Sequence, residues 1–529
     1  MNTIKTKIAA ALTLGLLLTG CSANDNGGDG TVTPPETAAT QNAPTSTKTG
    51  TFTYAISGDP SSTNAINTGD RWGLTFANIV YEQLARVDAT TGKTELVLAD
   101  SIDTSSDGLT ITVKLKPGIK WSDGEALTSA DVVFTYNTKA VKDNGAADAL
   151  WIDGKQIEIT ALDELTVQFK LPSYSAAAIS GIVTETFIIP EHVYPAGTDF
   201  SGNELPSYVG SNGYKLDEYK RGEYIKFVVN DNYHGTKPAI ANLVLRIVSN
   251  ADTVKAALQT GEVDAAYVVP AQIPDLTSSP VTVYPYPEGR VAYVGVVVPK
   301  VPNEKLRQAL FFALDRAQIA KAAWLDPNNY ELAYTILPPS NAWATTDVEQ
   351  YIQDVEKAES LVAESGVANP KLTLGYSGGD LQAQAEVAVI QAEAAAVGIT
   401  IELVPNDNYY DEIEKGAGSA IDLFIGGYIM GIDPDAYGGL FRSDGSWNYF
   451  SYGNADVDAA FTAGAAARTD ADRHTAYDKV QRLIAEDAIF YAIADNLKII
   501  AINDRIGGID QAKLVSIYTF EDFGKLTEK

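Results

Sequence analysis

The chain of 529 residues contains one cysteine, Cys21, and three histidines. One cysteine cannot form an internal disulfide, and it cannot supply the cysteine cluster of a zinc or iron–sulfur site. Lysine and arginine total 39 against 68 aspartates and glutamates, which gives a net charge of -29. Nucleic acids are bound through clustered basic residues, so this balance argues against a nucleic-acid partner. It argues equally against a polybasic attachment to anionic lipid.

Long apolar runs are missing after residue 21, so we expect no later membrane span. Before it, two lysines precede an apolar run over residues 8–18, which is too short to cross a bilayer and is typical of a secretory signal peptide. The run ends in Leu18-Thr19-Gly20-Cys21, which resembles the lipobox of bacterial lipoproteins. The resemblance implies a signal peptide over residues 1–20 and a lipid attached to Cys21. The alternative is an ordinary signal peptide with a chance cysteine.

Residues 21–50 have little that could fold. After Cys21 they include no aromatic residue, and Val32 is the only valine, isoleucine, leucine or phenylalanine. Such a segment cannot bury enough apolar surface to order itself. We expect a flexible linker that holds the following domain roughly 30 Å from a lipid anchor.

From residue 51 onward the pattern is that of a mixed α/β protein. Polar and apolar residues alternate over 51–56 and 109–115, as in half-buried strands, and 157–171 predicts a hairpin turning at Asp163-Glu164. Thr128 followed by Asp131 predicts a capped helix start. After residue 240 strands alternate with helices, which favours parallel-rich sheets with helices on their faces. The expected helices are 72–84, 303–323, 350–365 and 381–397, and the expected strands include 371–376, 399–404 and 421–426.

One segment carries a family resemblance. Lys116-Pro117-Gly118 and Trp121-Ser122-Asp123-Gly124, followed by the capped run 127–134, resemble the signature of the family 5 extracellular solute-binding proteins, which are peptide and nickel receptors of ABC importers. Further matches occur in the family's order at 189–194, 209–214, 258–264, 306–316, 433–434 and 454–458. Each is weak alone, and their order is specific.

The resemblance implies an α/β, two-lobed, periplasmic-binding-protein-like clamshell of the large peptide-binding type. Lobe I would span 51–295 with an extra subdomain at about 95–235, lobe II 296–495, and a C-terminal return to lobe I 496–529. Hinge strands are expected near 295–299 and 492–500, with the ligand enclosed between the lobes.

The function implied is that of a monomeric substrate-binding lipoprotein on the outer face of the cell membrane. It would capture an oligopeptide without catalysis, metal or cofactor and deliver it to the permease of an ABC importer. Within the family, an oligosaccharide or a nickel complex remains the alternative ligand.

The segment after the expected strand 421–425 is the favoured ligand contact, because relatives pair the equivalent backbone with the ligand by strand addition. Glycines there would allow close approach of a ligand backbone. A loop after the first strand and an aromatic segment are added to it. The expected ligand-binding residues are Gly58, Asp59, Asn64, Gly427, Tyr428, Ile429, Met430, Gly431, Asp433, Trp447, Asn448 and Tyr449.

One position departs from the family. Many peptide receptors carry an aspartate three positions before the Asp433-Pro434 pair, and it binds the α-ammonium group of the ligand. This chain has Met430 there. Asp433 or Asp435 could replace that aspartate, or the amino end of the ligand could be left without a partner.

A different class of protein stays open at Gly375-Tyr376-Ser377-Gly378-Gly379, which matches the G-x-S-x-G pattern of serine hydrolases. Asp422 or Asp433 and then His474 would follow in hydrolase order. His474 lies in a charged stretch, however, so we expect no catalysis by Ser377. His192, His234 and His474 lie far apart in the sequence, which argues against a nickel site.

Overall fold

Two large mixed sheets organise the residues that the structure describes. The computed structural model describes residues 50–88, 93–145, 147, 150–152, 154–406 and 408–529. The expected signal peptide, Cys21 and almost all of the expected linker lie outside these residues. No helix among the described residues has the length and apolar character that a bilayer crossing requires.

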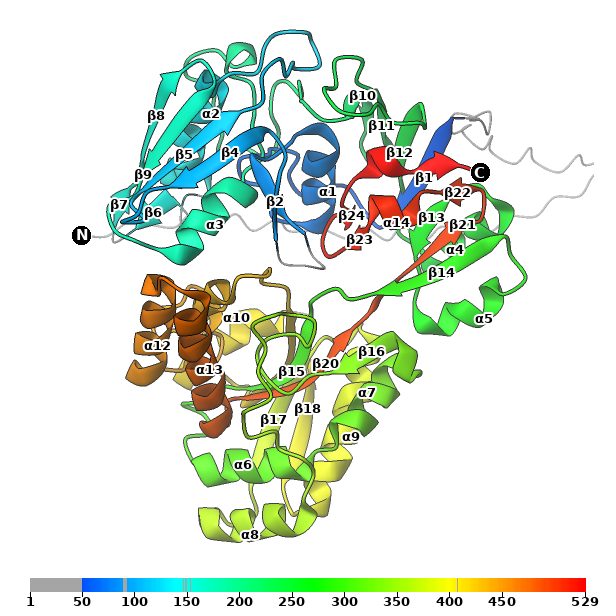
Figure 1. Ribbon diagram of the computed structural model, residues 1–529. Helices are drawn as coiled ribbons and strands as arrows, with labels where there is room; N and C mark the ends of the chain where they lie inside the picture. Colours follow the sequence, from blue (N-terminus) through cyan, green and yellow to red (C-terminus); the bar gives the residue numbers. More distant parts are fainter. Residues whose placement is uncertain (1–49, 89–92, 146, 148–149, 153, 407) are drawn as a thin grey trace, which may run out of the picture. The chain divides into compact units, whose positions relative to one another are not determined.

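The first sheet has seven strands in the order β10-β11-β12-β1-β13-β21-β14 (Figure 1). Strand β1 lies in its middle and pairs in parallel with β12 and β13. Every second residue of β1 enters one core cluster, where Phe52 and Tyr54 meet Phe76 of helix α1. The elements of this region are β1 (Thr51–Ile56), α1 (Arg71–Val80), β10 (Tyr214–Lys220), β11 (Tyr224–Val229), β12 (Asn242–Ile247), α4 (Ala251–Thr260), β13 (Ala265–Tyr267), β14 (Val281–Tyr286) and β21 (Lys498–Asn503).

The second sheet has six strands in the order β16-β20-β15-β19-β17-β18. Its strand β15 (Val291–Val296) is buried throughout, because helices cover both faces of the sheet. Val294 packs with α6, α7 and α9, whereas Tyr293 packs with α12 and α13. The remaining elements are α6 (Glu304–Ala313), α7 (Arg316–Trp324), β16 (Tyr330–Leu332), α8 (Val355–Ser365), β17 (Lys371–Tyr376), α9 (Leu381–Ala396), β18 (Thr400–Pro405), β19 (Leu423–Tyr428), α12 (Ala455–Ala466), α13 (Asp470–Glu486) and β20 (Phe490–Asn496).

A separate four-stranded antiparallel sheet of order β4-β5-β9-β8 packs with helix α2. Trp121 is fully buried in its core beside Ile111, Val113 and Val132. The predicted hairpin of β8 and β9 is present, but it turns at Glu164-Leu165, one residue later than expected, because Asp163 still pairs with Thr166. These elements are β4 (Ala99–Thr104), β5 (Thr110–Leu115), α2 (Ser129–Lys139), β8 (Glu158–Asp163), β9 (Thr166–Lys170) and the neighbouring α3 (Ala176–Thr184).

The chain passes twice between the two large sheets. Strand β14 ends at Tyr286 in the first sheet, and β15 begins at Val291 in the second. On the return, only Leu497 separates β20 from β21 (Figure 1). The second passage lies within the expected 492–500, but the first precedes the expected 295–299. Residues 295–296 belong to β15, so that expectation was wrong by several residues.

Some predicted elements have other bounds. The single helix expected over 303–323 is two helices, because Leu314 is extended and Asp315 caps a new start at Arg316. The helix expected from residue 350 begins at Val355, where Asp354 provides the cap. Helix α1 ends at Val80 rather than at 84. Strand β19 continues to Tyr428, beyond the expected end at 426, so Gly427 and Tyr428 lie in the strand and not in a loop.

Candidate functional site

Strand β19 has one partly free edge. Along one side it pairs with β15 through its whole length, from Leu423 to Tyr428. Along the other side it pairs with β17 only at Leu423 and Phe424. Among the described strands, none continues this pairing over 425–428. An extended chain could therefore add to β19 at this edge.

Two glycines near the end of β19 have no side chains, and a different neighbouring side chain fills the space over each of them. A Cβ at Gly426 would lie 2.2 Å from the ring of Tyr293, which is buried. A Cβ at Gly427 would lie 2.0 Å from the guanidinium group of Arg290. The space over Gly426 thus belongs to the core, and the space over Gly427 is taken by a cation.

The turn after β19 is fixed by hydrogen bonds. The Tyr428 hydroxyl donates to the carbonyl of Ile336 at 2.6 Å, and the Asn341 amide donates to the carbonyl of Ile432 at 3.0 Å. Gly431 has a φ of 80°, which favours glycine. The residues between these bonds, Ile429 and Met430, are half-buried.

The two acids that could replace the missing aspartate have other partners. Asp433 accepts a hydrogen bond from Arg473 Nη2 at 2.9 Å, and Asp435 accepts one from the Tyr477 hydroxyl at 3.1 Å. Burial raises the pKa of Asp435, and the charge of Asp433 raises it further. Their positions therefore do not favour a clamp for the α-ammonium group of a ligand.

Two expected residues of the loop after β1 have structural partners. Asp59 accepts hydrogen bonds from the Tyr219 hydroxyl and from the backbone of Gly222, which ties this loop to the β10–β11 turn. Asn64 is fully buried, and its amide donates to the carbonyls of Phe200 and Gly202. Because Asn64 has no exposed surface, the structure does not bring it to a ligand. Gly58 remains half-exposed.

The expected aromatic segment is divided in a similar way. Trp447 is 51% exposed, which makes it available for contact. The Asn448 amide donates to the carbonyls of Arg442 and Tyr452, so it stabilises its own loop. Tyr449 packs edge-on against Tyr410 at 4.8 Å between ring centroids.

A cluster at the passage between the sheets carries several ionisable groups that sequence patterns did not indicate. Arg71 at the start of α1 pairs with Glu288, which is buried. Lys498 Nζ lies 3.8 Å from the same carboxylate, and the ring of Tyr267 lies beside both cations. These residues come from distant parts of the sequence and match no short motif, so only the fold brings them together.

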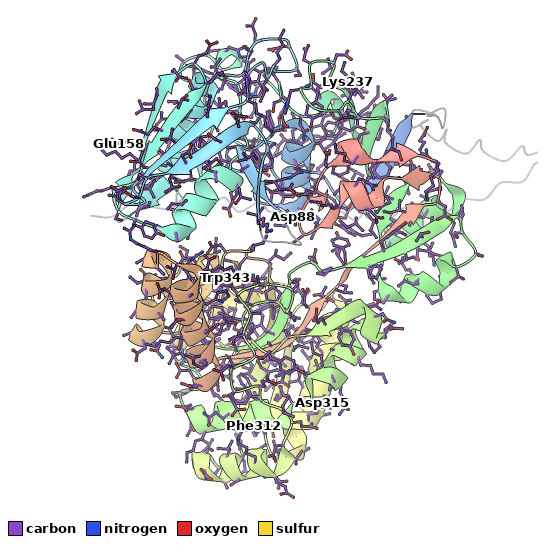
Figure 2. The ribbon with its side chains drawn as sticks, in the orientation of Figure 1. Asp88, Glu158, Lys237, Phe312, Asp315 and Trp343 are labelled. Atoms are coloured by element: carbon purple, nitrogen blue, oxygen red, sulfur yellow. The ribbon has the colours of Figure 1, made fainter. Side chains whose placement is uncertain are left out.

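The hydrolase alternative has no support in the geometry. His474 stacks on Trp343, which is labelled in Figure 2, at 4.2 Å between centroids. Asp422 accepts a hydrogen bond from the backbone amide of Thr373 and lies near Lys300. Asp433 accepts a hydrogen bond from the guanidinium group of Arg473. Within the described chain, no hydrogen bond links His474 to either acid. The acid that would orient the histidine of a Ser-His-Asp triad is therefore missing from its place.

The histidines likewise do not converge on a metal. His192 bonds Asp123 at 2.8 Å, and His234 bonds Glu82 at 3.0 Å. One group of three acids does converge, formed by Asp88, Glu95 and Glu521. Lys513 pairs with all three and Arg86 with Glu95 and Glu521, so two side-chain cations already offset part of their charge.

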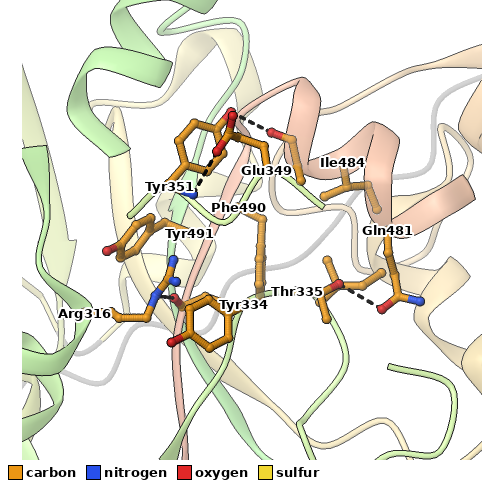
Figure 3. Close-up of a pocket in the computed structure, with 12 residues that line it drawn as sticks. Arg316, Tyr334, Thr335, Glu349, Tyr351, Gln481, Ile484, Phe490 and Tyr491 are labelled. Carbon is orange, nitrogen blue, oxygen red and sulfur yellow. Dashed lines mark hydrogen bonds between the residues drawn. The ribbon is translucent and has the colours of Figure 1, made fainter. Parts of the chain in front are cut away.

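A small cavity of about 10 Å³ lies beside Arg316, the last residue of the segment 306–316 that resembles the family (Figure 3). The guanidinium carbon lies 4.2 Å from the centroid of the Tyr334 ring and 4.8 Å from that of Tyr491. Its Nε donates to the carbonyl of Ala492 on β20. Nη1 is buried without a hydrogen-bond partner, and the space suits about one water molecule. Arg316 thus supports the strand that leads back to the first sheet.

These sheets and their two connecting passages define a solute-binding fold, and comparison with known proteins agrees. The crystal structure of the ABC transporter substrate binding protein CtaP from Listeria monocytogenes matches with a TM-score of 0.86 and 33% identity, over 91% of this chain and 99% of that one. The α/β periplasmic-binding-protein-like fold is therefore confirmed.

The family follows from the sequence comparison. Residues 93–449 match the family described as "Bacterial extracellular solute-binding proteins, family 5 Middle". The oligopeptide-binding protein AppA of Bacillus subtilis is 25% identical over 91% of both chains. The glutathione-binding protein GsiB of Pectobacterium atrosepticum is 28% identical over 88% of this chain and 91% of its own. The chain belongs to this family, and it is an extracytoplasmic ABC-transporter substrate-binding protein of the peptide and nickel group, not an enzyme.

Proposed function

We propose that the protein captures oligopeptides between its two lobes and delivers them to the permease of an ABC importer. The partly free edge of β19 carries this proposal: the Ile425 carbonyl already accepts the Tyr409 hydroxyl, but no described strand pairs with the backbone beyond it on this side, where a peptide backbone can add. Main-chain hydrogen bonds give affinity without demanding a particular sequence. An oligosaccharide has no regular row of amides to pair with this edge.

The relatives support a peptide. AppA is named for oligopeptides and GsiB for glutathione. A nickel complex receives less support from this chain, since His192, His234 and His474 each bond or stack locally.

The lobes of this proposal follow the sheets. Lobe I comprises 51–286, lobe II comprises 291–496, and 498–529 returns to lobe I. The extra subdomain, expected at about 95–235, would end before β10, because β10 and β11 belong to the seven-stranded sheet. The polypeptide between β14 and β15 and the single residue between β20 and β21 would form the hinge. Closure over a ligand is the motion known for such two-domain binding proteins.

Identification of the natural ligand tests the function directly. The protein is purified natively from the membrane fraction of its source, unfolded, and the released molecules are identified by mass spectrometry. We expect peptides of several sequences and a narrow range of lengths. Recovery of an oligosaccharide or a nickel complex in stoichiometric amount would contradict the proposal.

We further propose that Cys21 carries lipid and that residues 21–50 tether the domain to the membrane. Two acyl chains anchor a protein stably where a single chain is marginal. Cys21→Ser should move the protein from the membrane fraction into the soluble extracytoplasmic fraction, with unchanged peptide binding. Membrane retention of this variant would contradict the anchor.

A further inference from the structure

Three basic side chains meet where the chain passes between its two large sheets. Arg71 begins α1, Arg290 directly precedes β15, and Lys498 begins β21. Arg71 and Lys498 both lie against the ring of Tyr267, with the guanidinium carbon at 5.3 Å and the ammonium nitrogen at 4.6 Å from its centroid. Arg290 Nη1 donates to the Asn496 side chain at 3.1 Å, two residues before Lys498.

One of these cations is neutralised within the protein. Arg71 Nη2 pairs with Glu288, and its Nη1 donates to the Tyr267 hydroxyl at 3.0 Å and to the carbonyl of Ile517 at 3.1 Å. Glu288 is 3% exposed and lies at a longer 3.8 Å from Lys498. A single carboxylate therefore serves two cations, and Arg71 makes the closer pair.

Arg290 has no such partner. In the described part of the chain no carboxylate lies within ion-pairing distance of its guanidinium group, whose bond to Asn496 involves a neutral amide. Burial lowers the pKa of Lys498, Glu288 raises it, and the charges of Arg71 and Arg290 lower it again. Arg71 and Lys498 thus meet at Tyr267, and Arg290 is tied through Asn496 to the residues directly before Lys498.

Two buried acids interact with Arg290, and neither is fully ionised at neutral pH. Burial raises the pKa of Glu386 on α9 to about 8, although Arg290 opposes this shift. Burial also raises the pKa of Asp495 to about 7. One oxygen of Asp495 accepts the backbone amide of Arg290 at 3.2 Å, and the other has no hydrogen bond. In a chain with a net charge of -29, this local excess of positive charge is unusual.

Arg290 also lies beside β19, the strand whose edge is proposed to pair with the ligand. The guanidinium group of Arg290 occupies the space over Gly427, where its nitrogens and carbon lie 2.0–2.6 Å from the position of a Cβ. Gly427 belongs to the edge of β19 that has no strand partner after Phe424. A ligand that pairs with this edge therefore passes next to Arg290.

Resting on the peptide function proposed above, we propose that Arg290 and Lys498 bind a carboxylate of the peptide ligand. A guanidinium group presents two parallel N–H donors to a carboxylate, and an ammonium group adds a point charge. The peptide would be held by its acidic group rather than by its α-ammonium group, since Asp433 and Asp435 are bonded to Arg473 and Tyr477. The carboxylate is either the carboxyl terminus or an aspartate or glutamate side chain.

The test uses defined peptides. Pools of tri- to pentapeptides are offered as free acids and as C-terminal amides, and the best binder is resynthesised with its side-chain acids changed to amides and, separately, with an acetylated amino terminus. Wild-type protein should bind one of the two amidated forms at least tenfold more weakly than the acid, about 1.4 kcal/mol. Which form loses affinity identifies the source of the carboxylate. Acetylation should change the affinity less than threefold.

Variants assign the effect to the residues. In Arg290→Met and Lys498→Met the acid should bind more weakly while the amide is unaffected, so the preference shrinks. Arg290→Lys should keep part of it. Lys305→Met, which removes an exposed cation paired with Glu364 on lobe II, is the matched control and should bind like wild type. Circular dichroism and thermal unfolding verify that each variant is folded.

The outcomes separate the two proposals. Equal binding of the acid and both amidated forms by wild type would overturn the carboxylate site while leaving the peptide function in place. An undiminished preference in both Met variants would overturn the assignment to Arg290 and Lys498. Failure of wild type to bind any peptide would overturn the peptide function and this inference with it.

Discussion

At the scale of single residues, neighbouring glycines of β19 have different physical roles. Gly426 faces Tyr293, which stacks on Phe490 with 4.4 Å between centroids and has no space to move. Gly427 faces the end of a long, half-exposed arginine side chain, which can rotate away. The sequence shows two adjacent glycines and predicts the same role for both. Only the packing distinguishes them.

The pair gives a matched prediction. Gly426→Ala should lower the free energy of unfolding by about 1–3 kcal/mol, because a methyl group must be inserted into a packed core. Gly427→Ala should change it by less than about 0.5 kcal/mol and should weaken peptide binding by displacing Arg290. Urea unfolding and calorimetric titration measure both quantities. A stability loss of equal size in the two variants would contradict this assignment.

Glu386 predicts how stability depends on pH. Burial raises its folded-state pKa from the ordinary 4.5 to about 8, so folding favours the protonated form. This contribution to stability is complete below about pH 4.5 and is lost as the pH rises to about 8. Glu386→Gln keeps the shape of the protonated side chain without its ionisation.

We therefore expect Glu386→Gln to be close to wild type at pH 5 and more stable by about 1–3 kcal/mol at pH 8.5. Urea unfolding at the two pH values measures the difference. Glu402→Gln, on an exposed position of β18, is the control and should show no such dependence. A Gln variant that loses stability at high pH as steeply as wild type would contradict the role of Glu386.

At the scale of elements, the start of α2 explains why the family-like segment has its sequence. Asp131 completes the capping box with Thr128, whose backbone amide donates to it at 2.8 Å. The same carboxylate receives the indole N–H of Trp121 at 3.3 Å and the backbone amide of Glu191 at 2.8 Å. One side chain thus joins the helix start, the buried tryptophan and a distant segment. The sequence predicted the cap, but the other two bonds depend on tertiary contacts.

Removal of this carboxylate should cost more than removal of a cap alone. Asp131→Ala leaves three donors unsatisfied near a buried site, and we expect a loss of about 2–4 kcal/mol in the free energy of unfolding. Thr128→Ala removes only the side-chain part of the cap and should cost about 1 kcal/mol. Chemical denaturation compares the two variants. Equal losses would mean that the bonds to Trp121 and Glu191 contribute nothing.

The predicted element boundaries were wrong where the local sequence is compatible with more than one structure. Gly427 and Tyr428 lie beyond the strand expected over 421–426, yet both belong to β19 because β15 supplies a full set of strand pairs. The expected helix over 303–323 has a continuous apolar pattern, and its break at Leu314 follows from the Asp315 cap. In both places a tertiary or capping contact outweighs the local pattern.

At the scale of the whole molecule, two chain passages connect the large sheets, and the proposed ligand contacts elements next to both. Arg290 precedes β15 after the first passage, and Lys498 begins β21 after the second. A bound peptide would therefore link the two lobes as well as occupy a site. Ligand binding to the folded state stabilises it in proportion to the logarithm of ligand concentration over Kd.

A peptide at one hundred times its Kd should add about 2.7 kcal/mol to the free energy of unfolding. Differential scanning calorimetry should then show a rise in Tm for the transition that includes both lobes. In Arg290→Met at the same peptide concentration the rise should be smaller. A rise confined to one of two separate transitions would contradict a ligand shared by the lobes.

The sequence by itself determined the α/β class, the family and most of the secondary structure, because periodicity, caps and turns are local properties. It also indicated β19 and the turn after it as the place to look for a ligand. Only the tertiary structure decided which of the expected residues remain available. It commits Asp59, Asn64 and Asn448 to the protein's own backbone or side chains, and it brings Arg290 and Lys498 together across 208 positions of the chain. The physical reason is that hydrogen-bond partners and charge balance are set by neighbours in space, and a sequence shows neighbours only along the chain.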